Sequence, residues 1–220
     1  MADKTILDVS RWQGNVDWKK VRASGKADGV MLKTVSTNRK LSKRKDGLYI
    51  DPTFERNYAE CKRVGLPVGV YYYTYAVSHT SANAELALLK TALTGKTFEL
   101  PICVDVEENK LRKLGKQALT DLTAYALATI EQWGFYALLY TGLKFGENRL
   151  YMGGAALRKY DVWVAAYRDN KPTPAWPFGM WQYTSTASVP GITGNADLSH
   201  AYKDYAAIIA KKGLDRLREG

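Results

Sequence analysis

The chain has 220 residues, of which 46% are hydrophobic and 25% are charged, as is usual for one globular domain with a full hydrophobic core. It contains no run of about 18 apolar residues, which excludes a membrane-spanning helix. The net charge is +10 and the pI about 9.4, and this favours a polyanionic partner: nucleic acid, anionic lipid, or a polymer that carries carboxylates and phosphates.

The first half of the chain alternates short β-rich runs with amphipathic helices that end near glycine. The predicted strands are residues 5–10, 29–35, 68–76, 101–107 and 135–141. The predicted helices are residues 16–24, 51–65, 81–93 and 117–133. The second of these helices opens at Asp51-Pro52, where Asp is expected to be the N-cap and Pro the first helical residue. Strands and helices that alternate at this spacing predict parallel βαβ units.

The second half lacks clear long helices between its strands. The predicted strands are residues 161–167, 179–183 and 195–198, and a final amphipathic helix is predicted at about 202–217. Eight strands with helices mainly in the first part predict an α/β fold, a TIM-like (β/α) barrel that is irregular on one side. Because no linker, repeat or low-complexity segment is present, residues 1–220 are expected to form a single domain with its core at about 5–205.

Acidic side chains lie near the ends of three predicted strands. Asp8 lies on the first strand, Asp105, Glu107 and Glu108 end the fourth, and Asp197 lies on the last. Barrels of this kind carry their active sites at the carboxyl ends of the strands, so three strands are expected to bring carboxylates to one rim. Taken singly, Asp8 and Asp197 are explained at least as well by loop caps or ion-pair partners.

The Asp105/Glu107 pair is harder to explain by structure alone. Residues two apart on an extended strand point to the same side, with Cα atoms roughly 6.5 to 7 Å apart. Two acids in a partly desolvated pocket resist joint ionisation, so at least one pKa is raised. A protonated donor beside an ionised carboxylate is what the hydrolysis of an acetal requires. Glu108 is expected to point the other way, toward a helix or the solvent.

Other side chains offer no competing chemistry. The sequence has no Gly-x-Ser-x-Gly motif, and His79 and His200 do not have metal-ligand spacing. Neither a metal nor another cofactor is implied. Cys61 and Cys103 are expected to be buried free thiols. No zinc spacing, Walker-type loop or RNA-recognition signature supports nucleic-acid binding, so nucleic acid is not an expected partner despite the charge.

Several short stretches stand out over about residues 5–205: DVSRWQG at 8–14 with VDW at 16–18, GVYYY at 69–73, PICVDVE at 101–107, LYT at 139–141, VWVAAY at 162–167, MWQY at 180–183, and VPGI at 189–192 leading to Asp197-Leu198. In this order they resemble the family 25 glycoside hydrolases, which are muramidases of phage endolysins and bacterial autolysins. Each stretch alone is weak evidence, whereas the ordered set is specific. The resemblance implies a flattened (β/α)5β3 barrel that cleaves the β-1,4 bond from N-acetylmuramic acid to N-acetylglucosamine in bacterial peptidoglycan.

The resemblance also implies roles for individual residues. Glu107 matches the family's proton donor, Asp105 the Asp two residues earlier, and Asp8 and Asp197 the acids on the first and last strands. Further positions that line the sugar groove in the family are Tyr71, Tyr140, Trp163, Tyr167 and Gln182. Simple barrel packing is the alternative explanation for the aromatic rings among them. The implied mechanism is protonation of the glycosidic oxygen by Glu107, with attack by the substrate's own N-acetyl oxygen while Asp105 orients the amide. A direct Asp nucleophile and an inverting route with water remain alternatives.

One stretch departs from the family pattern. After the second strand many relatives read Lys-Ala-Thr/Ser-Glu-Gly, whereas this chain reads KTVST at 33–37. The loop that follows, residues 38–49, looks longer than usual and holds five cations: Arg39, Lys40, Lys43, Arg44 and Lys45. This basic 39–45 loop is expected to lie beside the groove and to bind anionic wall polymers. A solvated loop without a binding role is the alternative.

The expected function is peptidoglycan hydrolysis, for phage-driven host lysis or wall remodelling, without membrane insertion. The alternative is a non-catalytic cell-wall sugar-binding module on the same barrel, which loss of Asp105 or Glu107 would have favoured. The first eight residues contain no apolar stretch, so no secretory signal peptide is expected. The protein is then expected to be made in a host cytoplasm and to reach the wall after release, or by another export route.

Overall fold

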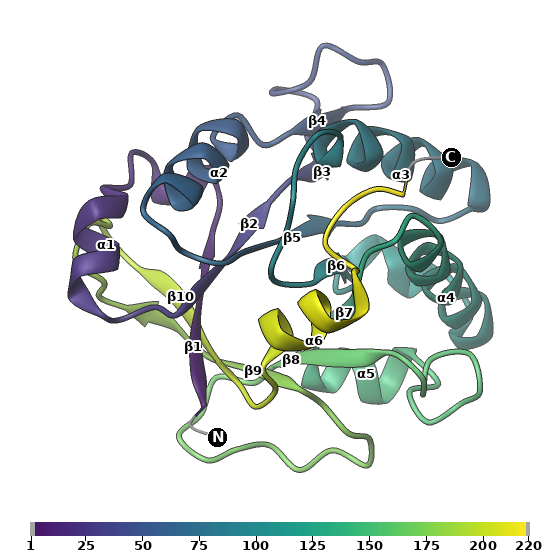
Figure 1. Cartoon of the computed structure of the whole chain (residues 1–220). Helices are drawn as coiled ribbons and strands as arrows, with labels where there is room; N and C mark the ends of the chain where they lie inside the picture. The colour runs from purple at the N-terminus through teal and green to yellow at the C-terminus, as the bar shows by residue number, and fades with distance from the viewer. Residues whose placement is uncertain (1–2, 219–220) are drawn as a thin grey trace.

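The computed structural model of the protein describes residues 3–218, which form a closed eight-stranded barrel with helices packed around it (Figure 1). Around the barrel the strands follow the order β1-β10-β9-β8-β7-β6-β5-β2. The strands are β1 Lys4–Val9, β2 Gly29–Lys33, β3 Val35–Thr37, β4 Leu48–Ile50, β5 Val68–Tyr73, β6 Ile102–Asp105, β7 Ala137–Gly142, β8 Asp161–Ala165, β9 Met180–Ala187 and β10 Ala196–Ala201. The helices are α1 Trp18–Ser24, α2 Phe54–Arg63, α3 His79–Leu93, α4 Lys116–Gln132, α5 Leu143–Arg149 and α6 Tyr205–Lys212, with short 3-10 turns η1 Arg11–Gln13 and η2 Asn109–Lys113. The predicted α/β class and irregular barrel are confirmed.

The direction of β10 determines which residues meet at the open end of the barrel. The other barrel strands run parallel to one another, whereas β10 is antiparallel to both of its neighbours, β1 and β9. Residues near the amino end of β10 therefore lie at the same end of the barrel as the carboxyl ends of the parallel strands. The pairing of Asp8 with Asp197 follows directly from this register.

Two apolar layers hold the barrel together. Strand residues point alternately outward to the helices and inward to the barrel axis, so strands such as β2 are buried on both faces. The inner layer contains Met31, Cys103 and Trp163. Tyr205 of α6 also belongs to this inner layer, together with Ile6 near the amino end of β1, so α6 covers the amino ends of the parallel strands (Figure 1). The opposite end of the barrel forms its mouth.

The start of α2 differs from the prediction. Thr53 occupies the N-cap position and Phe54 is the first helical residue. Asp51 is buried, and its carboxylate accepts hydrogen bonds from the backbone N–H groups of Arg11 (3.0 Å) and Thr53 (2.9 Å). This carboxylate joins η1 to the segment before α2, so its burial serves a tertiary contact in place of the predicted helix cap.

Two other predictions were wrong for local reasons, and one short helix was missed. The predicted loop at 38–49 ends inside β4, which pairs with β3 in a two-stranded hairpin of only three residues per strand. Helix α5 was not predicted, because its seven residues are too few to show a periodic pattern. Helix α6 ends at Lys212, well short of residue 217, because Gly213 adopts a left-handed conformation (φ 60°) that terminates the helix.

The two cysteines and the absence of a membrane-spanning helix can be compared directly with the fold. Cys61 and Cys103 are both buried and free, which confirms the prediction, and burial raises the pKa of each thiol above its usual range. Within residues 3–218, no helix combines the length and the hydrophobicity that crossing a bilayer requires.

A buried acid on α3 holds the loop that leaves β5. Glu85 accepts hydrogen bonds from the Thr74 hydroxyl (2.6 Å) and from the backbone N–H of Tyr75 (2.8 Å). Burial raises the pKa of Glu85 from 4.5 to about 7. The folded protein thus binds more protons than the unfolded chain between these two values, and its free energy of unfolding falls as the pH rises through that window.

We therefore expect Glu85→Gln to flatten the decline in stability above pH 4.5. The contribution of Glu85 to this decline is about 3 kcal/mol in total, from the difference between its folded and ordinary pKa. Urea unfolding at pH 4.5, 6 and 7.5 measures the effect. The exposed Glu147→Gln variant is the control, and an unchanged pH slope in Glu85→Gln contradicts the prediction.

Candidate active site

A polar cavity of about 170 Å³ lies at the mouth of the barrel, and all four predicted acids line it. The lining residues are Asp8, Lys33, Tyr71, Tyr73, Asp105, Glu107, Tyr140, Trp163, Tyr167 and Asp197. Four of the five predicted groove residues are also among them, whereas Gln182 is not. The structure therefore brings together at one site predicted residues from six different strands or from just beyond them.

Gln182 lies behind the cavity and contacts four residues of its wall. Its Nε2 donates to Asp8 Oδ2 (3.1 Å) and to Asp197 Oδ2 (3.5 Å), while its Oε1 accepts from the hydroxyls of Tyr140 (2.9 Å) and Tyr167 (3.0 Å). Two phenol donors on the oxygen and two carboxyl acceptors on the nitrogen fix the amide in one orientation. Gln182 is only 1% exposed. It therefore does not face the cavity but positions the residues of the cavity wall through these hydrogen bonds.

Asp8 and Asp197 face each other across the β1–β10 pair. Burial raises the pKa of Asp8 to about 8, and the neighbouring Asp197 charge adds to this rise, while the Tyr71 hydroxyl and the Lys33 charge oppose it. Burial also raises the pKa of Asp197. Asp8 therefore keeps its proton at neutral pH, and this limits the negative charge gathered on this side of the cavity.

The second acid pair lies across the mouth, at the end of β6. Asp105 is the last residue of that strand, and Glu107 lies just beyond it, so the predicted strand to residue 107 was too long. Burial, and next the Glu107 charge, raise the pKa of Asp105 well above its usual range. Burial likewise raises the pKa of Glu107, with Lys33 acting against it. Both shifts favour the protonated form of the pair, which is the form that general acid catalysis requires.

One atom of this pair lacks a hydrogen-bond partner. Asp105 Oδ1 is buried, and no donor among residues 3–218 reaches it. An unpaired buried carboxylate oxygen is costly, and this agrees with the raised pKa of Asp105.

Aromatic rings make the floor and one edge of the cavity. Trp163 is 1% exposed, its indole N–H donates to Ser199 Oγ (3.0 Å), and its ring meets Tyr140 edge to face at 4.7 Å between centroids. Tyr71 packs against the same indole at 6.3 Å. Tyr167 differs, since 58% of its side chain is exposed, and it offers a ring at the edge of the mouth.

Sequence reasoning missed Lys33 and Tyr73 as site residues. The Lys33 ammonium lies 5.0 Å from the centroid of the Tyr73 ring and 5.8 Å from that of Tyr71. Lys33 follows four buried residues at the carboxyl end of β2. This is the same pattern that indicates Asp105, and it applies to a basic residue as well as to an acid. Tyr73 donates to Glu108 (3.2 Å), which also caps η2, so Glu108 is fixed beside the site and is not simply solvated.

Comparison with known proteins agrees with this arrangement. Residues 7–192 match the family model described as Glycosyl hydrolases family 25. The chain belongs to glycosyl hydrolase family 25. The matched segment includes Asp8, the Asp105/Glu107 pair and Gln182, and it ends just before Asp197.

This family 25 glycosyl hydrolase has curated relatives and solved structural neighbours. The autolytic lysozyme of Clostridium acetobutylicum is 28% identical over 193 residues, which are 87% of this chain and 54% of that protein. The bacterial lysozyme of Streptomyces coelicolor superposes with a TM-score of 0.78 at 23% identity and covers 96% of this chain and 98% of its own. The autolysin LytC of Streptococcus pneumoniae, in complex with a synthetic peptidoglycan ligand, is 27% identical with a TM-score of 0.73 and covers 91% and 47%.

Membership of family 25 makes the protein a glycoside hydrolase, as the sequence predicted. Hydrolysis of a glycosidic bond uses one carboxylic acid to protonate the leaving oxygen and a second group to stabilise or attack the positive anomeric carbon. The Asp105/Glu107 pair and the Asp8/Asp197 pair line a single cavity. The site therefore contains the two kinds of carboxyl group that this chemistry needs.

Proposed function

We propose that this protein hydrolyses bacterial peptidoglycan at the β-1,4 bond from N-acetylmuramic acid to N-acetylglucosamine. The observation that carries the proposal is the cavity with four carboxyl groups at the mouth of a family 25 barrel. Two relatives support the choice of polymer: one is named an autolytic lysozyme, and the structure of the other holds a synthetic peptidoglycan ligand.

In this proposal Glu107 is the proton donor. Burial raises the pKa of Glu107 above its usual range, and this favours the protonated form that a general acid needs. The proton passes to the glycosidic oxygen as the bond from that oxygen to C1 breaks, and Glu107 is left as a carboxylate. The ionised Glu107 then takes a proton from the water molecule that attacks C1 in the second step, which restores the starting state.

The proposed nucleophile is the N-acetyl oxygen of the muramic acid unit. This oxygen forms a bond to C1 while the acetamido N–H donates to the Asp105 carboxyl group, and water later displaces the oxygen. The place of Asp105 in the cavity lining, two residues before Glu107, supports this role. Two displacements at C1 retain the configuration, so NMR detection of the inverted anomer as the first product contradicts this mechanism.

The function itself is tested by identifying the new reducing ends. Purified peptidoglycan is incubated with the protein, reduced with borohydride and analysed by mass spectrometry after complete digestion. Reduced muramic acid is the expected product. Reduced glucosamine would show that the other β-1,4 bond is cut. Binding without any release of reducing ends, on several wall types, would favour the non-catalytic sugar-binding module instead.

The basic 39–45 loop is the proposed contact with anionic wall polymers. It joins β3 and β4, which follow β2 at the mouth end of the barrel, and Figure 1 shows it projecting from the molecule. All five of its cations are exposed. Arg44 pairs with Asp46 (2.7 Å), so the charge offered to a polymer comes mainly from the other four: Arg39, Lys40, Lys43 and Lys45.

We expect that replacing these four residues with serine weakens binding to walls rich in anionic polymer and flattens its salt dependence. The physical reason is that fewer fixed charges remain for salt to screen. Sedimentation of the protein with purified walls at 50 to 300 mM NaCl measures both effects. A control with the same change in net charge replaces the exposed Lys19, Arg22, Lys26 and Lys211. Equal losses in the two variants would mean that only net charge matters.

A further inference from the structure

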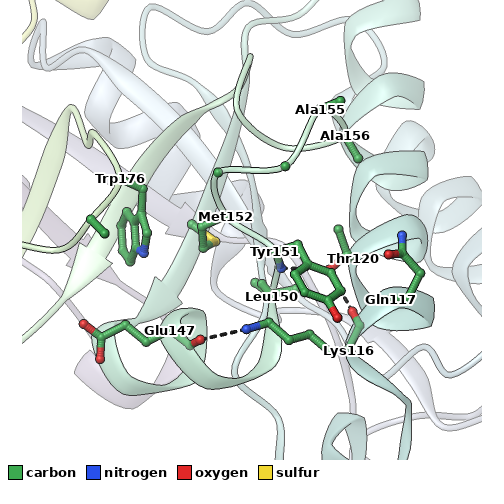
Figure 2. Close-up of a pocket in the computed structure, with 13 residues that line it drawn as sticks. Lys116, Gln117, Thr120, Glu147, Leu150, Tyr151, Met152, Ala155, Ala156 and Trp176 are labelled. Atoms are coloured by element: carbon green, nitrogen blue, oxygen red, sulfur yellow. Dashed lines mark hydrogen bonds between the residues drawn. The ribbon is translucent and has the colours of Figure 1, made fainter.

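A cavity of about 750 Å³, larger than the one at the mouth, opens on the side of the barrel. It lies between the amino end of α4, the end of α5, residues 150–156 and Trp176 (Figure 2). No residue that lines it also lines the mouth. Its volume falls within the range that is usual for small-molecule sites, yet the proposed reaction makes no use of it.

The floor of this side pocket is apolar and fixed. It consists of Leu150, Met152 and Trp176, all of which are buried. Gly146 of α5 lies against the indole, because a Cβ at this position would come within 3.3 Å of the Trp176 ring and 3.0 Å of Thr141. The absence of a side chain at residue 146 therefore lets the Trp176 ring pack closely on α5 and reach the pocket.

One wall of the side pocket carries the exposed ring of Tyr151, whose position is fixed by contacts with α4. Tyr151 is 48% exposed, and its backbone N–H donates to Thr120 Oγ1 (3.0 Å). The Lys116 ammonium lies 5.0 Å from the centroid of the Tyr151 ring and donates to the backbone oxygen of Glu147 (2.9 Å). In Figure 2 Tyr151 and Trp176 lie on either side of Met152. The pocket thus has a buried apolar floor beside an exposed, anchored ring.

The polar groups of the rim balance in charge. Lys116 and Glu147 carry opposite charges, and both line the pocket. The amide nitrogen of Gln117 donates to Asp121 Oδ1 (2.8 Å), which orients the Gln117 amide and leaves its oxygen as an acceptor. A rim of this kind suits a neutral ligand that has both donors and acceptors better than it suits a polyanion.

We propose that the side pocket is a second glycan site, separate from the catalytic mouth, which binds an N-acetylated amino sugar of the wall polymer. The Tyr151 ring packs on the apolar face of the pyranose, and the floor at Met152 takes the methyl of the acetyl group. The Gln117 oxygen accepts from the acetamido N–H, and Glu147 accepts from a hydroxyl. The proposal rests on the proposed function, since it takes the same polymer as ligand.

Methionine methyl groups separate the two sites in one NMR experiment. Met152 lines the side pocket, whereas Met31 and Met180 belong to the inner layer of the barrel beneath the mouth. The probe is a soluble β-1,4-linked tetramer of N-acetylglucosamine, added to protein with ¹³C-methyl methionine and with Glu107→Gln to prevent turnover. We expect a saturable shift of the Met152 signal. A Met152 signal that stays unchanged up to millimolar tetramer, with or without shifts at Met31 and Met180, overturns the proposal.

Matched variants separate binding from folding. Tyr151→Ala is expected to weaken the binding seen at Met152 by about tenfold, and the milder Gln117→Ala to weaken it less. The control is Val77→Ala, at an exposed apolar residue that lines neither cavity. In protein that retains Glu107 and is therefore active, Tyr151→Ala is expected to slow the solubilisation of whole walls but not the hydrolysis of soluble fragments. Equal slowing of both reactions overturns the proposal. Failure of the proposed function is recognised separately, because the Met152 shift requires no turnover.

Discussion

Replacing Glu107 with Gln is expected to lower kcat on peptidoglycan by about 10³-fold, the usual contribution of a positioned general acid. The amide has nearly the same shape as the acid but no proton to give to the leaving oxygen. Glu107 lines the cavity at the mouth of the barrel. Because the amide keeps the shape of the acid there, substrate binding is expected to change little. Release of reducing ends over time measures kcat, and sedimentation with walls measures binding.

The matched control is Glu108→Gln, one residue further along the chain. Glu108 accepts from Tyr73 and caps η2 but does not line the cavity, so its loss is expected to cost less than tenfold. If Glu107→Gln retains more than a tenth of the wild-type kcat, Glu107 is not the acid. Asp105→Asn then becomes the next variant to measure, since Asp105 is the other buried acid of the pair.

Replacing Gln182 with Met, which has similar length but no hydrogen-bonding amide, is expected to lower kcat by about 10²-fold. The amide positions Asp8 and Asp197 on one side and Tyr140 and Tyr167 on the other. Small displacements of groups around a reacting centre have effects of this size. The lost N–H donor also destabilises the ionised form of Asp8, whose pKa is expected to rise above its present value of about 8.

The pH profile distinguishes a positioning role for Gln182 from a merely structural one. A structural role lowers the midpoint of thermal unfolding and leaves the shape of the profile unchanged. In a positioning role, the limb of the pH profile of kcat that reflects titration of the Asp8/Asp197 pair also moves to higher pH. Gln132→Met, at an exposed residue at the end of α4, is the control. An unmoved profile in Gln182→Met contradicts the positioning role.

The sequence predicted best those site residues that end a buried strand, because one rule then gives their place at the rim of the barrel. Asp105 follows apolar residues on a strand that is buried on both faces, and the carboxyl ends of parallel strands share one rim, so its location followed from the pattern. The function of Gln182 could not be predicted in this way. Its strand position shows only that it points inward, whereas its role depends on four partners from three other strands and the loop after β8.

The parts of the fold that could not be predicted are short or depend on distant contacts. The β3–β4 hairpin has three residues per strand, too few to show an alternating pattern. The buried Asp51 resembles a helix N-cap in sequence, but its partner Arg11 lies 40 residues away. The antiparallel direction of β10 has no local signal either, and it alone places Asp197 opposite Asp8.

The pairing of β1 with β10 has a consequence for biosynthesis. The first barrel strand to leave the ribosome receives its final partner only when the last one has been made, so the barrel closes at a seam between residues about 190 positions apart. A nascent chain without β9 and β10 lacks Gln182 and Asp197, and Asp8 then lies on an open edge. We therefore expect hydrolytic competence to be acquired with the final strand pairing, and a chain that ends before β9 to be inactive.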